Sequence, residues 1–377
     1  MPLNTIPNTG LTSRGYTTDR LVTPLIINGD MSVSQRATST TDVGASSTYP
    51  TIDRFGYRKG GSPSFRATMS QSSTVPTAQG FKYSFKVDCT TANTSLASST
   101  RFGIDQKIEA QNLQFLEQGT SNAKATTLSF WVRSNLTGTY ILWIYKEDGT
   151  ARAIAKSYTI NSADTWEKKI INIPGDTNAA GAIDNNNGEG WRITWHLAAG
   201  TTFNSGTLAT SWENYSAANI AVGQVNFASS TDNEWYLTGV QLEVGEFDST
   251  TLPSFPFESH DSNFKKCCRY FQNQEYDTNA NMIGTGYNES NSIGRGVIMF
   301  PFGHMRSRPS ISTPTVSNAF RIISQSHDLY KNTIPLKENI STYSFRAGNN
   351  QDTVTDGQVN LWIIHSSGAK IQYDADL

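Results

Sequence analysis

Short runs in which apolar residues alternate with other residues recur along nearly the whole chain, and they constrain its fold more than any other feature. In one such run, Trp191, Ile193 and Trp195 share one side. An alternation with period two places successive side chains on opposite faces of a β-strand. The same pattern recurs at residues 81–87, 128–133, 236–244, 297–300, 320–323, 343–346, 359–364 and 370–373. Because Gly, Asn, Asp and Ser turns separate these runs, the sequence predicts an all-β fold of antiparallel β-sandwiches.

One segment breaks the strand pattern and marks a domain boundary. Phe264, Cys267 and Cys268 repeat at the spacing of one helical face, which predicts a short helix within residues 262–272. Asp261 or Ser262 is the expected N-cap of this helix. The strand pattern resumes after it. We therefore divide the chain into an extended arm at residues 1–25, a sandwich at 26–250, a linker with a short helix at 251–272 and a smaller sandwich at 273–377.

The composition argues against several classes of function. A net charge of −2 and an isoelectric point of about 6.2 give no broad basic surface, so we expect no nucleic-acid binding. No stretch reaches the roughly 18 apolar residues of a membrane span, and we expect no membrane insertion. Three cysteines cannot form a disulfide framework. The first residues also lack the basic and apolar regions of a signal peptide. These features favour synthesis in a reducing compartment.

No arrangement of residues predicts catalysis. The five histidines show no zinc-ligand spacing, and we interpret His196 as a solvated or hydrogen-bonded strand residue. Cys267 and Cys268 lie on the apolar side of the predicted helix, which indicates small buried residues rather than nucleophiles. A carboxylate pair for glycoside hydrolysis stays open as an alternative, because any two strands could supply one. We predict that the protein is not an enzyme, and we assign no catalytic residue.

Two polar segments offer candidate binding residues. The segment at residues 173–189 is rich in oxygen ligands that suit calcium, although Asx-turns between strands are the favoured interpretation. Trp212 and Tyr215 lie in a loop-like segment beside Glu213 and Asn214. Exposed rings in such a setting stack on the C–H faces of sugars, while polar neighbours bind the hydroxyl groups. We therefore name Trp212 and Tyr215 as candidate glycan-binding residues, with packing between the sheets as the alternative.

An ordered series of short motifs resembles phage tail-fibre and related virion surface modules. The motifs are LIINGDM at residues 25–31, QR at 35–36, YPTIDRF at 49–55, TWE at 165–167, IPGDT at 173–177, LAAGTTF at 197–203, YLTGVQLEVG at 236–245, CRYFQ at 268–272, MRSRP at 305–309 and DADL at 374–377. Each motif is short, and their order along the chain makes the resemblance specific. The chain departs from the family pattern at Met31, Phe55 and Gly239, and Gly239 stands where an acidic residue is expected.

The resemblance implies a jelly-roll sandwich like those of carbohydrate-binding modules, followed by a smaller β-domain. Members are typically virion surface proteins, they are often homotrimers, and some contact host surface glycans. The segments NGD at residues 28–30 and QLE at 241–243 resemble the paired first and last strands of those modules. In some modules these two strands hold a structural calcium, which implies Asp30 and Glu243 as its ligands here. No other cofactor is implied.

The resemblance therefore predicts a non-enzymatic virion protein, assembled in the host cytoplasm, that serves as a tail-fibre or receptor-binding component. Its expected partners are other virion proteins, reached through the N-terminal arm, and a host surface glycan. Within the arm, the candidate anchoring residues are Leu3, Ile6, Leu11 and Tyr16. Two alternatives stay open, namely a capsid decoration or head-fibre protein and a glycan-degrading, tailspike-like enzyme.

Overall fold

The chain forms two compact units, Met1–Asn263 and Phe264–Leu377, and each is described by itself. A computed structural model describes residues 24–45, 48–62, 64–275, 281–325, 328–334, 336–350 and 356–377. The candidate anchoring residues Leu3, Ile6, Leu11 and Tyr16 lie outside the described residues. The division between the units falls within the segment 251–272 that the sequence predicted as a linker.

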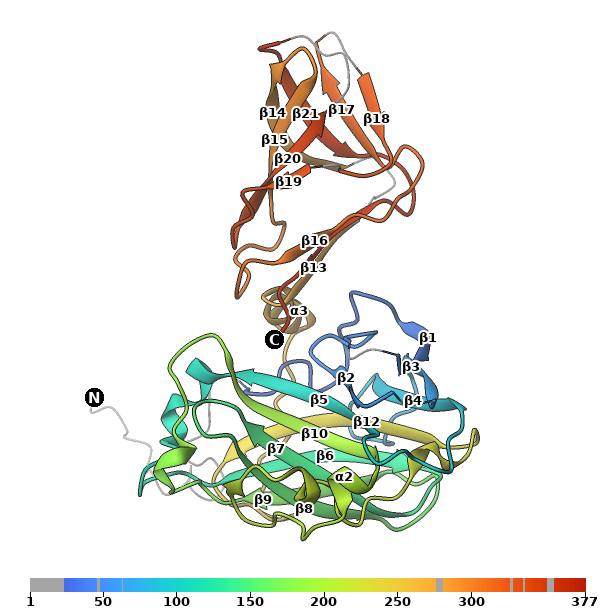
Figure 1. The fold of residues 1–377 in the computed structure, drawn as a ribbon, viewed down its shortest axis with the longest axis vertical. Coiled ribbons are helices and arrows are strands. Elements are labelled where there is room, and N and C mark those ends of the chain that lie inside the picture. The colour runs from blue at the N-terminus through green and yellow to red at the C-terminus, as the bar shows by residue number, and fades with distance from the viewer. Residues whose placement is uncertain are drawn as a thin grey trace, which may run out of the picture. The chain divides into compact units, whose positions relative to one another are not determined.

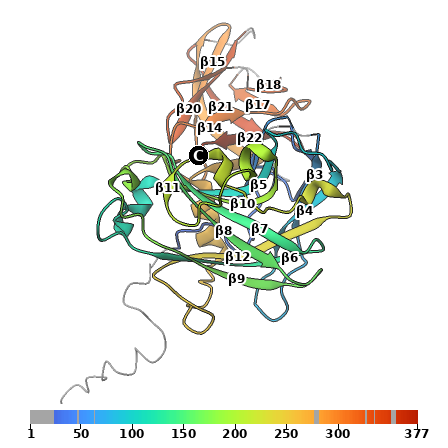
Figure 2. The same cartoon turned by 60° about the horizontal axis from the view of Figure 1, so that its bottom comes forward.

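Unit 1 is a jelly-roll-like sandwich of two six-stranded antiparallel sheets (Figure 1). The strand orders are β1-β3-β4-β12-β6-β9 in the first sheet and β11-β8-β7-β10-β5-β2 in the second. Figure 2 labels the strands from β3 to β12. The strands are β1 (Ser39–Val43), β2 (Gly56–Gly60), β3 (Arg66–Ser72), β4 (Ser84–Thr91), β5 (Arg101–Glu109), β6 (Thr126–Ser134), β7 (Gly138–Lys146), β8 (Arg152–Ile160), β9 (Glu167–Ile173), β10 (Glu189–Ala199), β11 (Glu213–Asn214) and β12 (Glu234–Val244). This architecture confirms the predicted all-β fold.

Aromatic rings from both sheets meet in the core of unit 1. Phe130 of β6 packs edge-on against Trp195 of β10, with ring centroids 5.7 Å apart, and against Tyr158 of β8 at 5.2 Å. Trp195 is fully buried. These are the inward residues of the period-two runs, so the alternation that predicts the strands also supplies the contact between the sheets.

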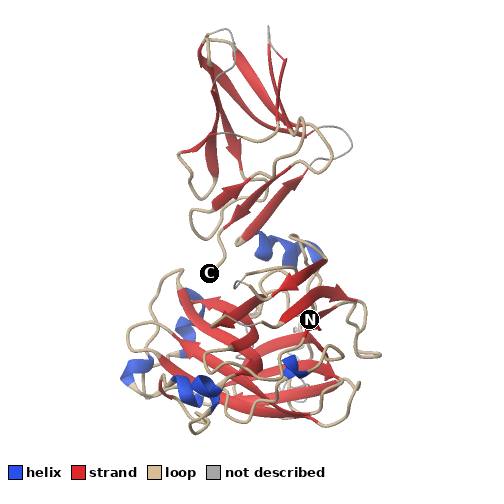
Figure 3. Cartoon of the chain, turned by 45° about the vertical axis from the view of Figure 1, so that its right-hand side comes forward, coloured by secondary structure: helices blue, strands red, loops and turns tan. Residues whose placement is uncertain are grey.

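Helical turns are few and short among the described residues of unit 1 (Figure 3). They are η1 (Ala110–Leu116), η2 (Ala179–Gly181), α2 (Thr201–Asn204), η3 (Ala217–Asn219) and η4 (Phe227–Ser229). The segment that carries α2 and η3 covers part of the outward face of the second sheet. Ile220 and Ala221 join Ile141, Trp143 and Ala155 of that sheet in one buried apolar cluster.

The expected first strand at Asn28 to Asp30 is a turn instead. Asn28 and Met31 have φ angles of 62° and 60°, so the backbone curls where a strand would extend. The turn still lies beside the last strand, because the Val240 N–H donates to the Gly29 carbonyl at 2.9 Å. A Cβ on Gly29 would lie 2.1 Å from the Val240 carbonyl oxygen, so this approach requires glycine.

Unit 2 contains a three-stranded and a seven-stranded antiparallel sheet, ordered β13-β22-β16 and β18-β17-β21-β14-β15-β20-β19. The strands are β13 (Phe271–Glu275), β14 (Asn281–Ser290), β15 (Ile293–Met299), β16 (Ser310–Ser312), β17 (Phe320–Ser324), β18 (Asp328–Lys331), β19 (Leu336–Glu338), β20 (Ser344–Asn350), β21 (Val359–Ile364) and β22 (Lys370–Asp374). Tyr373 of the small sheet packs on Phe345 of the large one, which makes this unit the predicted second sandwich.

The predicted helix is present as α3 (His260–Cys268), two residues earlier than expected. The Ser262 N–H donates to the Ser259 hydroxyl at 3.2 Å. Ser259 is therefore the N-cap, and the expectation of Asp261 or Ser262 is wrong. Cys267 and Cys268 are buried, as predicted.

Candidate functional site: an arginine face on the second sheet of unit 1

Three strands of the second sheet bring four basic side chains to its outward face. On β10, Trp191, Ile193 and Trp195 belong to the core, so the alternate positions Arg192 and His196 face outward. Arg58 and Arg101 join them from β2 and β5. We call Arg58, Arg101, Arg192 and His196 the arginine face.

The strand register explains why Arg58 and His196 share this face. Gly103 of β5 pairs with His196 on one side and with Arg58 on the other. Residues directly opposite each other in an antiparallel ladder point to the same face. A Cβ at Gly103 would lie 2.7 Å from the Trp195 carbonyl oxygen, so glycine is required there. As a result, no side chain from β5 stands between Arg58 and His196.

Many buried polar atoms on this face lack a hydrogen-bond partner among the described residues. They are Arg58 Nε, Arg101 Nε and Nη1, Trp143 Nε1, Glu189 Oε1, Arg192 Nε, Thr194 Oγ1, and both ring nitrogens of His196. Thr194 pairs with Trp143 of β7 and Asp105 of β5, so these residues belong to the same face. Buried polar atoms in native proteins are almost always hydrogen-bonded. Such a concentration of unsatisfied atoms indicates a place where water or a ligand binds.

The cations on the face differ in how their charge is balanced. Arg192 donates to Glu189 at 2.6 Å and lies 3.8 Å from Asp105, and the Lys107 ammonium lies 3.3 Å from Glu189. By contrast, the part of the chain that the structure describes places no carboxylate within 4.0 Å of the Arg58 or Arg101 guanidinium groups. Two of the three guanidinium groups therefore lack a carboxylate at ion-pair distance there, and Asp105 and Glu189 attract Arg58 only from farther away.

Burial and mutual repulsion shift the protonation equilibria on this face. Burial, followed by the charges of Arg192 and Arg101, lowers the pKa of Arg58 to about 10. Burial, together with Arg101 and Arg58, lowers the pKa of His196 to about 3. His196 is therefore a neutral imidazole near neutral pH, with one N–H donor and one acceptor nitrogen.

Aromatic rings border the arginine face. Tyr215, just after β11, is 36% exposed, and its ring centroid lies 5.4 Å from that of Tyr145. Arg192 lies over the Tyr145 ring at 5.6 Å, and Arg101 interacts with the Tyr215 hydroxyl. The face thus combines an open ring edge with cationic donors.

The two aromatic residues predicted to bind glycan have different surroundings. Tyr215 borders the arginine face. The ring of Trp212 is half-buried, lies 5.7 Å from that of Trp191, and donates its Nε1–H to the Pro174 carbonyl at 2.7 Å. Its indole thus packs against the core from outside and has its N–H engaged by the protein.

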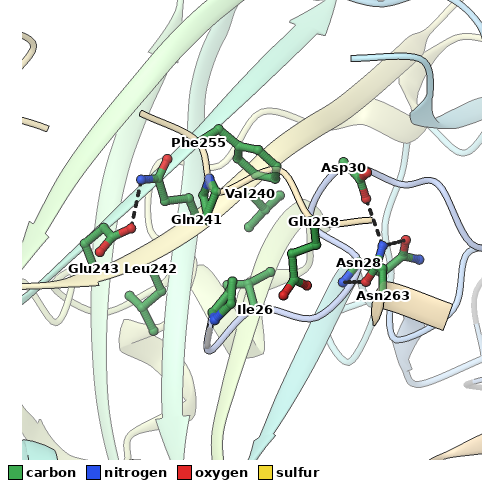
Figure 4. Close-up of a pocket in the computed structure, with 13 residues that line it drawn as sticks. Ile26, Asn28, Asp30, Val240, Gln241, Leu242, Glu243, Phe255, Glu258 and Asn263 are labelled. Atoms are coloured by element: carbon green, nitrogen blue, oxygen red, sulfur yellow. Dashed lines mark hydrogen bonds between the residues drawn. The ribbon is translucent and has the colours of Figure 1, made fainter. Parts of the chain in front are cut away.

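The two residues predicted to bind calcium line one pocket at the turn beside β12. In Figure 4, Asp30 and Glu243 lie at opposite sides of the view, with Glu258 between them. Asp30 accepts hydrogen bonds from Asn263 and Ser32. Glu243 accepts one from the Gln241 side chain at 3.0 Å. Each carboxylate is thus engaged with donors of the protein.

The described residues contain no group of three or more His, Cys, Asp or Glu side chains arranged to hold a metal ion. In the oxygen-rich segment 173–189, Asp176 forms a buried ion pair with Arg152, and the Asn178 side chain accepts from the Ala180 N–H. The segment thus contains the Asx-type turn that the sequence favoured.

Within the described residues, no helix is both long enough and apolar enough to cross a membrane.

Sequence reasoning missed the arginine face and misjudged His196. The histidine is only 1% exposed, so its interpretation as a solvated residue is wrong. No described residue hydrogen-bonds to either of its ring nitrogens. The alternation in β10 already placed Arg192 and His196 on one side. It could not place Arg58 and Arg101 beside them, because strand order is a tertiary property.

Among the comparisons with known proteins, only the comparison with solved structures found similar proteins. No protein-family model and no curated protein matches the chain. One similar structure is the enzymatically active domain of tailspike protein 4 of bacteriophage CBA120, with 12% identity and a TM-score of 0.30 over 59% of this chain. The chain spans about a fifth of that tailspike chain, 21% of its length.

Two other similar structures are carbohydrate-binding modules. The family 11 module of Clostridium thermocellum, in complex with a mixed-linked tetrasaccharide, is 12% identical over 58% of this chain and 99% of that one, with a TM-score of 0.28. TmCBM61, in complex with β-1,4-galactotriose, is 12% identical over 58% of this chain and 97% of that one, with a TM-score of 0.26. The sandwich architecture given above follows from the strand pairing of this chain itself.

Proposed function

We propose that unit 1 binds glycans through its arginine face, and that the chain is a phage virion protein that serves as a tail-fibre or receptor-binding component. The observation that carries the glycan proposal is the exposed Tyr215 ring beside a face of buried, unpartnered polar atoms. A sugar offers both kinds of group that such a face lacks, namely hydroxyl groups for the polar atoms and C–H faces for the ring.

The arrangement suits sugar recognition because its polar groups are already fixed by the sheet. Arg192 is held by Glu189, and Tyr145 lies under its guanidinium group. Polar groups that are positioned before binding lose little conformational freedom when the ligand arrives. Binding then gives Thr194 and His196 the partners that they lack among the described residues.

The virion role draws its support from the ordered motifs between residues 25 and 377 that resemble phage tail-fibre modules. On this proposal the arm at residues 1–25 attaches the chain to other virion proteins. The chain is a homotrimer, and copies meet through unit 2. Strongly exposed apolar side chains on its seven-stranded sheet support such a contact, and they are Met282, Val297, Met299 and Val359.

A binding experiment on glycans tests the first part of the proposal. We expect the purified protein to bind members of a panel of bacterial surface polysaccharides in isothermal titration calorimetry. Tyr215→Ala is expected to weaken binding about tenfold or more, equivalent to roughly 1.4 kcal/mol. Tyr83→Ala is the matched control, because Tyr83 is similarly exposed in unit 1 but lies outside the arginine face. Equal affinity of the two variants would contradict the assignment of the site.

A truncation tests the second part. A chain that lacks residues 1–25 should keep the unfolding transitions of both units, yet fail to join assembling particles. Electron cryomicroscopy of intact particles then locates the full chain. Density at the tail supports receptor binding, whereas density over the capsid lattice supports the decoration alternative. Sustained release of reducing ends from a bound polysaccharide would instead favour the tailspike-like enzyme.

A further inference from the structure

We propose that the ligand of the arginine face is an acidic glycan, and that Arg58 and Arg101 bind its anionic group. This inference rests on the proposed function, and it adds the chemical class of the sugar. It follows from the charge balance of the face, from the position of His196, and from the chemistry of guanidinium groups.

The charge balance leaves two guanidinium groups for a ligand. Glu189 and Glu147 lie within 4.0 Å of Arg192, and Glu189 also lies near Lys107. Asp105 is shared, because it lies 3.8 Å from Arg192 and also attracts Arg58. Neither Arg58 nor Arg101 has a carboxylate of its own within 4.0 Å among the described residues. The Nε atoms of Arg58 and Arg101 are buried and have no hydrogen-bond partner among the described residues, while both side chains stay partly exposed. Like charges that are partly desolvated and close together repel one another, and a bound anion relieves that repulsion.

The hydroxyl groups of a neutral sugar do not neutralise the positive charge of the arginine face. A neutral sugar can accept hydrogen bonds from Arg58 and Arg101, but it also removes water from them without supplying a countercharge, which is costly. A carboxylate or sulfate group supplies the charge and also accepts paired N–H bonds from a planar guanidinium. The chemistry of the two arginines therefore favours an anionic over a neutral sugar.

His196 supplies a further, independent indication of a ligand. Its ring is 1% exposed, and neither nitrogen has a partner within the described structure. It projects beside Arg58 across Gly103, where β5 places no side chain between them. As a neutral imidazole it can donate one hydrogen bond to the anionic group and accept one from a neighbouring hydroxyl group. An anionic sugar unit over β5 would thus meet two guanidinium groups and one imidazole.

Matched pairs of polymers separate charge from sugar recognition. The probes are oligogalacturonate and its methyl-esterified form, and dextran sulfate and dextran, each measured by titration calorimetry at two salt concentrations. We expect at least tenfold tighter binding of the charged member of at least one pair. Arg58→Gln and Arg101→Gln should each remove most of this preference. Arg321→Gln, which lies in unit 2 and pairs with Asp328, should leave it unchanged.

The outcomes separate this inference from the proposed function. Equal binding of charged and neutral members would overturn the inference and leave glycan binding by unit 1 in place. No binding to these probes or to the polysaccharide panel would overturn both. A preserved preference for the charged member in both glutamine variants would overturn the assignment to these arginines. Arg58→Lys keeps the positive charge but removes the planar guanidinium group, so we expect an affinity for the charged polymer between those of the wild type and Arg58→Gln. An unchanged urea midpoint in these variants shows that unfolding does not cause the lower affinity.

Discussion

The two units differ in how two arginines of unit 1, Arg58 and Arg101, and three arginines of unit 2 are paired on their sheets. In unit 2, Arg295, Arg321 and Arg346 each pair with a carboxylate of the same sheet, at distances of 2.8, 2.6 and 3.2 Å. In unit 1, Arg58 and Arg101 have no carboxylate partner among the described residues. Arg192 of unit 1 resembles the arginines of unit 2, because it pairs with Glu189 of its own strand. The contrast therefore concerns Arg58 and Arg101, whose charge no carboxylate of their sheet balances at ion-pair distance.

This difference teaches which arginines are structural and which are candidates for binding. A guanidinium paired on a solvated sheet contributes little to stability and keeps no charge for a ligand. A partly buried, unpaired guanidinium destabilises the free protein slightly, and such groups concentrate at functional sites. Unit 1 also contains an arginine of a third kind, because Arg152 is buried and forms two hydrogen bonds with the buried Asp176.

The largest expected effect comes from breaking this buried pair. Arg152→Met leaves the Asp176 carboxylate buried without its partner, and we expect the free energy of unfolding of unit 1 to fall by about 3–5 kcal/mol. Pulsed alkylation of thiols at increasing urea concentration measures the unfolding of each unit separately. The buried Cys89 becomes labelled when unit 1 unfolds, and the buried Cys267 and Cys268 become labelled when unit 2 unfolds. Burial chiefly raises the pKa of the Cys89 thiol to about 11, which suppresses labelling of the folded unit.

The matched control removes both partners at once. Arg152→Met combined with Asp176→Leu should recover most of the lost stability, because no uncompensated charge remains. The prediction for Arg152→Met would be contradicted if Cys89 of this variant became labelled at the same urea concentration as Cys89 of the wild-type protein. Labelling of Cys267 and Cys268 should not change in either variant.

The next effect is the acid sensitivity of unit 1. Because the pKa of His196 is about 3 in the folded state and near 6.5 when unfolded, the unfolded chain binds a proton that the folded chain excludes. Stability is therefore fully present above about pH 6.5 and falls below it, by up to about 1.4 kcal/mol per pH unit. His196→Gln should remove this contribution, measured as a smaller loss of urea midpoint between pH 7 and pH 5.

The comparison between the units provides the control for this pH dependence. His304 lies in unit 2, so His304→Gln should leave the pH dependence of unit 1 as it is in the wild type. If the urea midpoint of unit 1 in His196→Gln fell with decreasing pH as steeply as in the wild type, the acid sensitivity would not come from His196.

The smallest effect distinguishes the two kinds of outward arginine. Arg58→Gln removes a partly desolvated charge that is repelled by its neighbours, so we expect the free energy of unfolding to rise or to stay within about 0.5 kcal/mol. Arg321→Gln removes a paired charge in unit 2 and should lower the urea midpoint of that unit slightly. A large loss of stability in Arg58→Gln would show that Arg58 is structural.

The sequence allowed most of the fold to be predicted, because period two is a local signal. The run around Trp191 became β10, and the run before Val244 became β12, since inward apolar residues must be buried in any sandwich. The prediction of a first strand at residues 28–30 was wrong, because the backbone turns at Asn28 and Met31. Their positive φ angles depend on how the turn contacts β12, which no local pattern encodes.

The candidate site was less accessible to prediction. Tyr215 was chosen because its loop is rich in polar and aromatic residues. It borders the arginine face, and its role in glycan binding stays a prediction. Trp212 in the same loop is half-buried against Trp191, because the loop folds back on the sandwich. Arg58 and Arg101 carried no local signal at all.

The sequence by itself determined the strands, their two-faced character and the position of the short helix, because hydrophobic burial depends on the spacing of residues along the chain. Only the tertiary structure decided which strands are neighbours. It placed β2 beside β5 and β5 beside β10, and so brought Arg58 and His196 to the two sides of Gly103. The charge balance of a face depends on distances in space, and residues 58, 101 and 192 become neighbours only when the sheet forms.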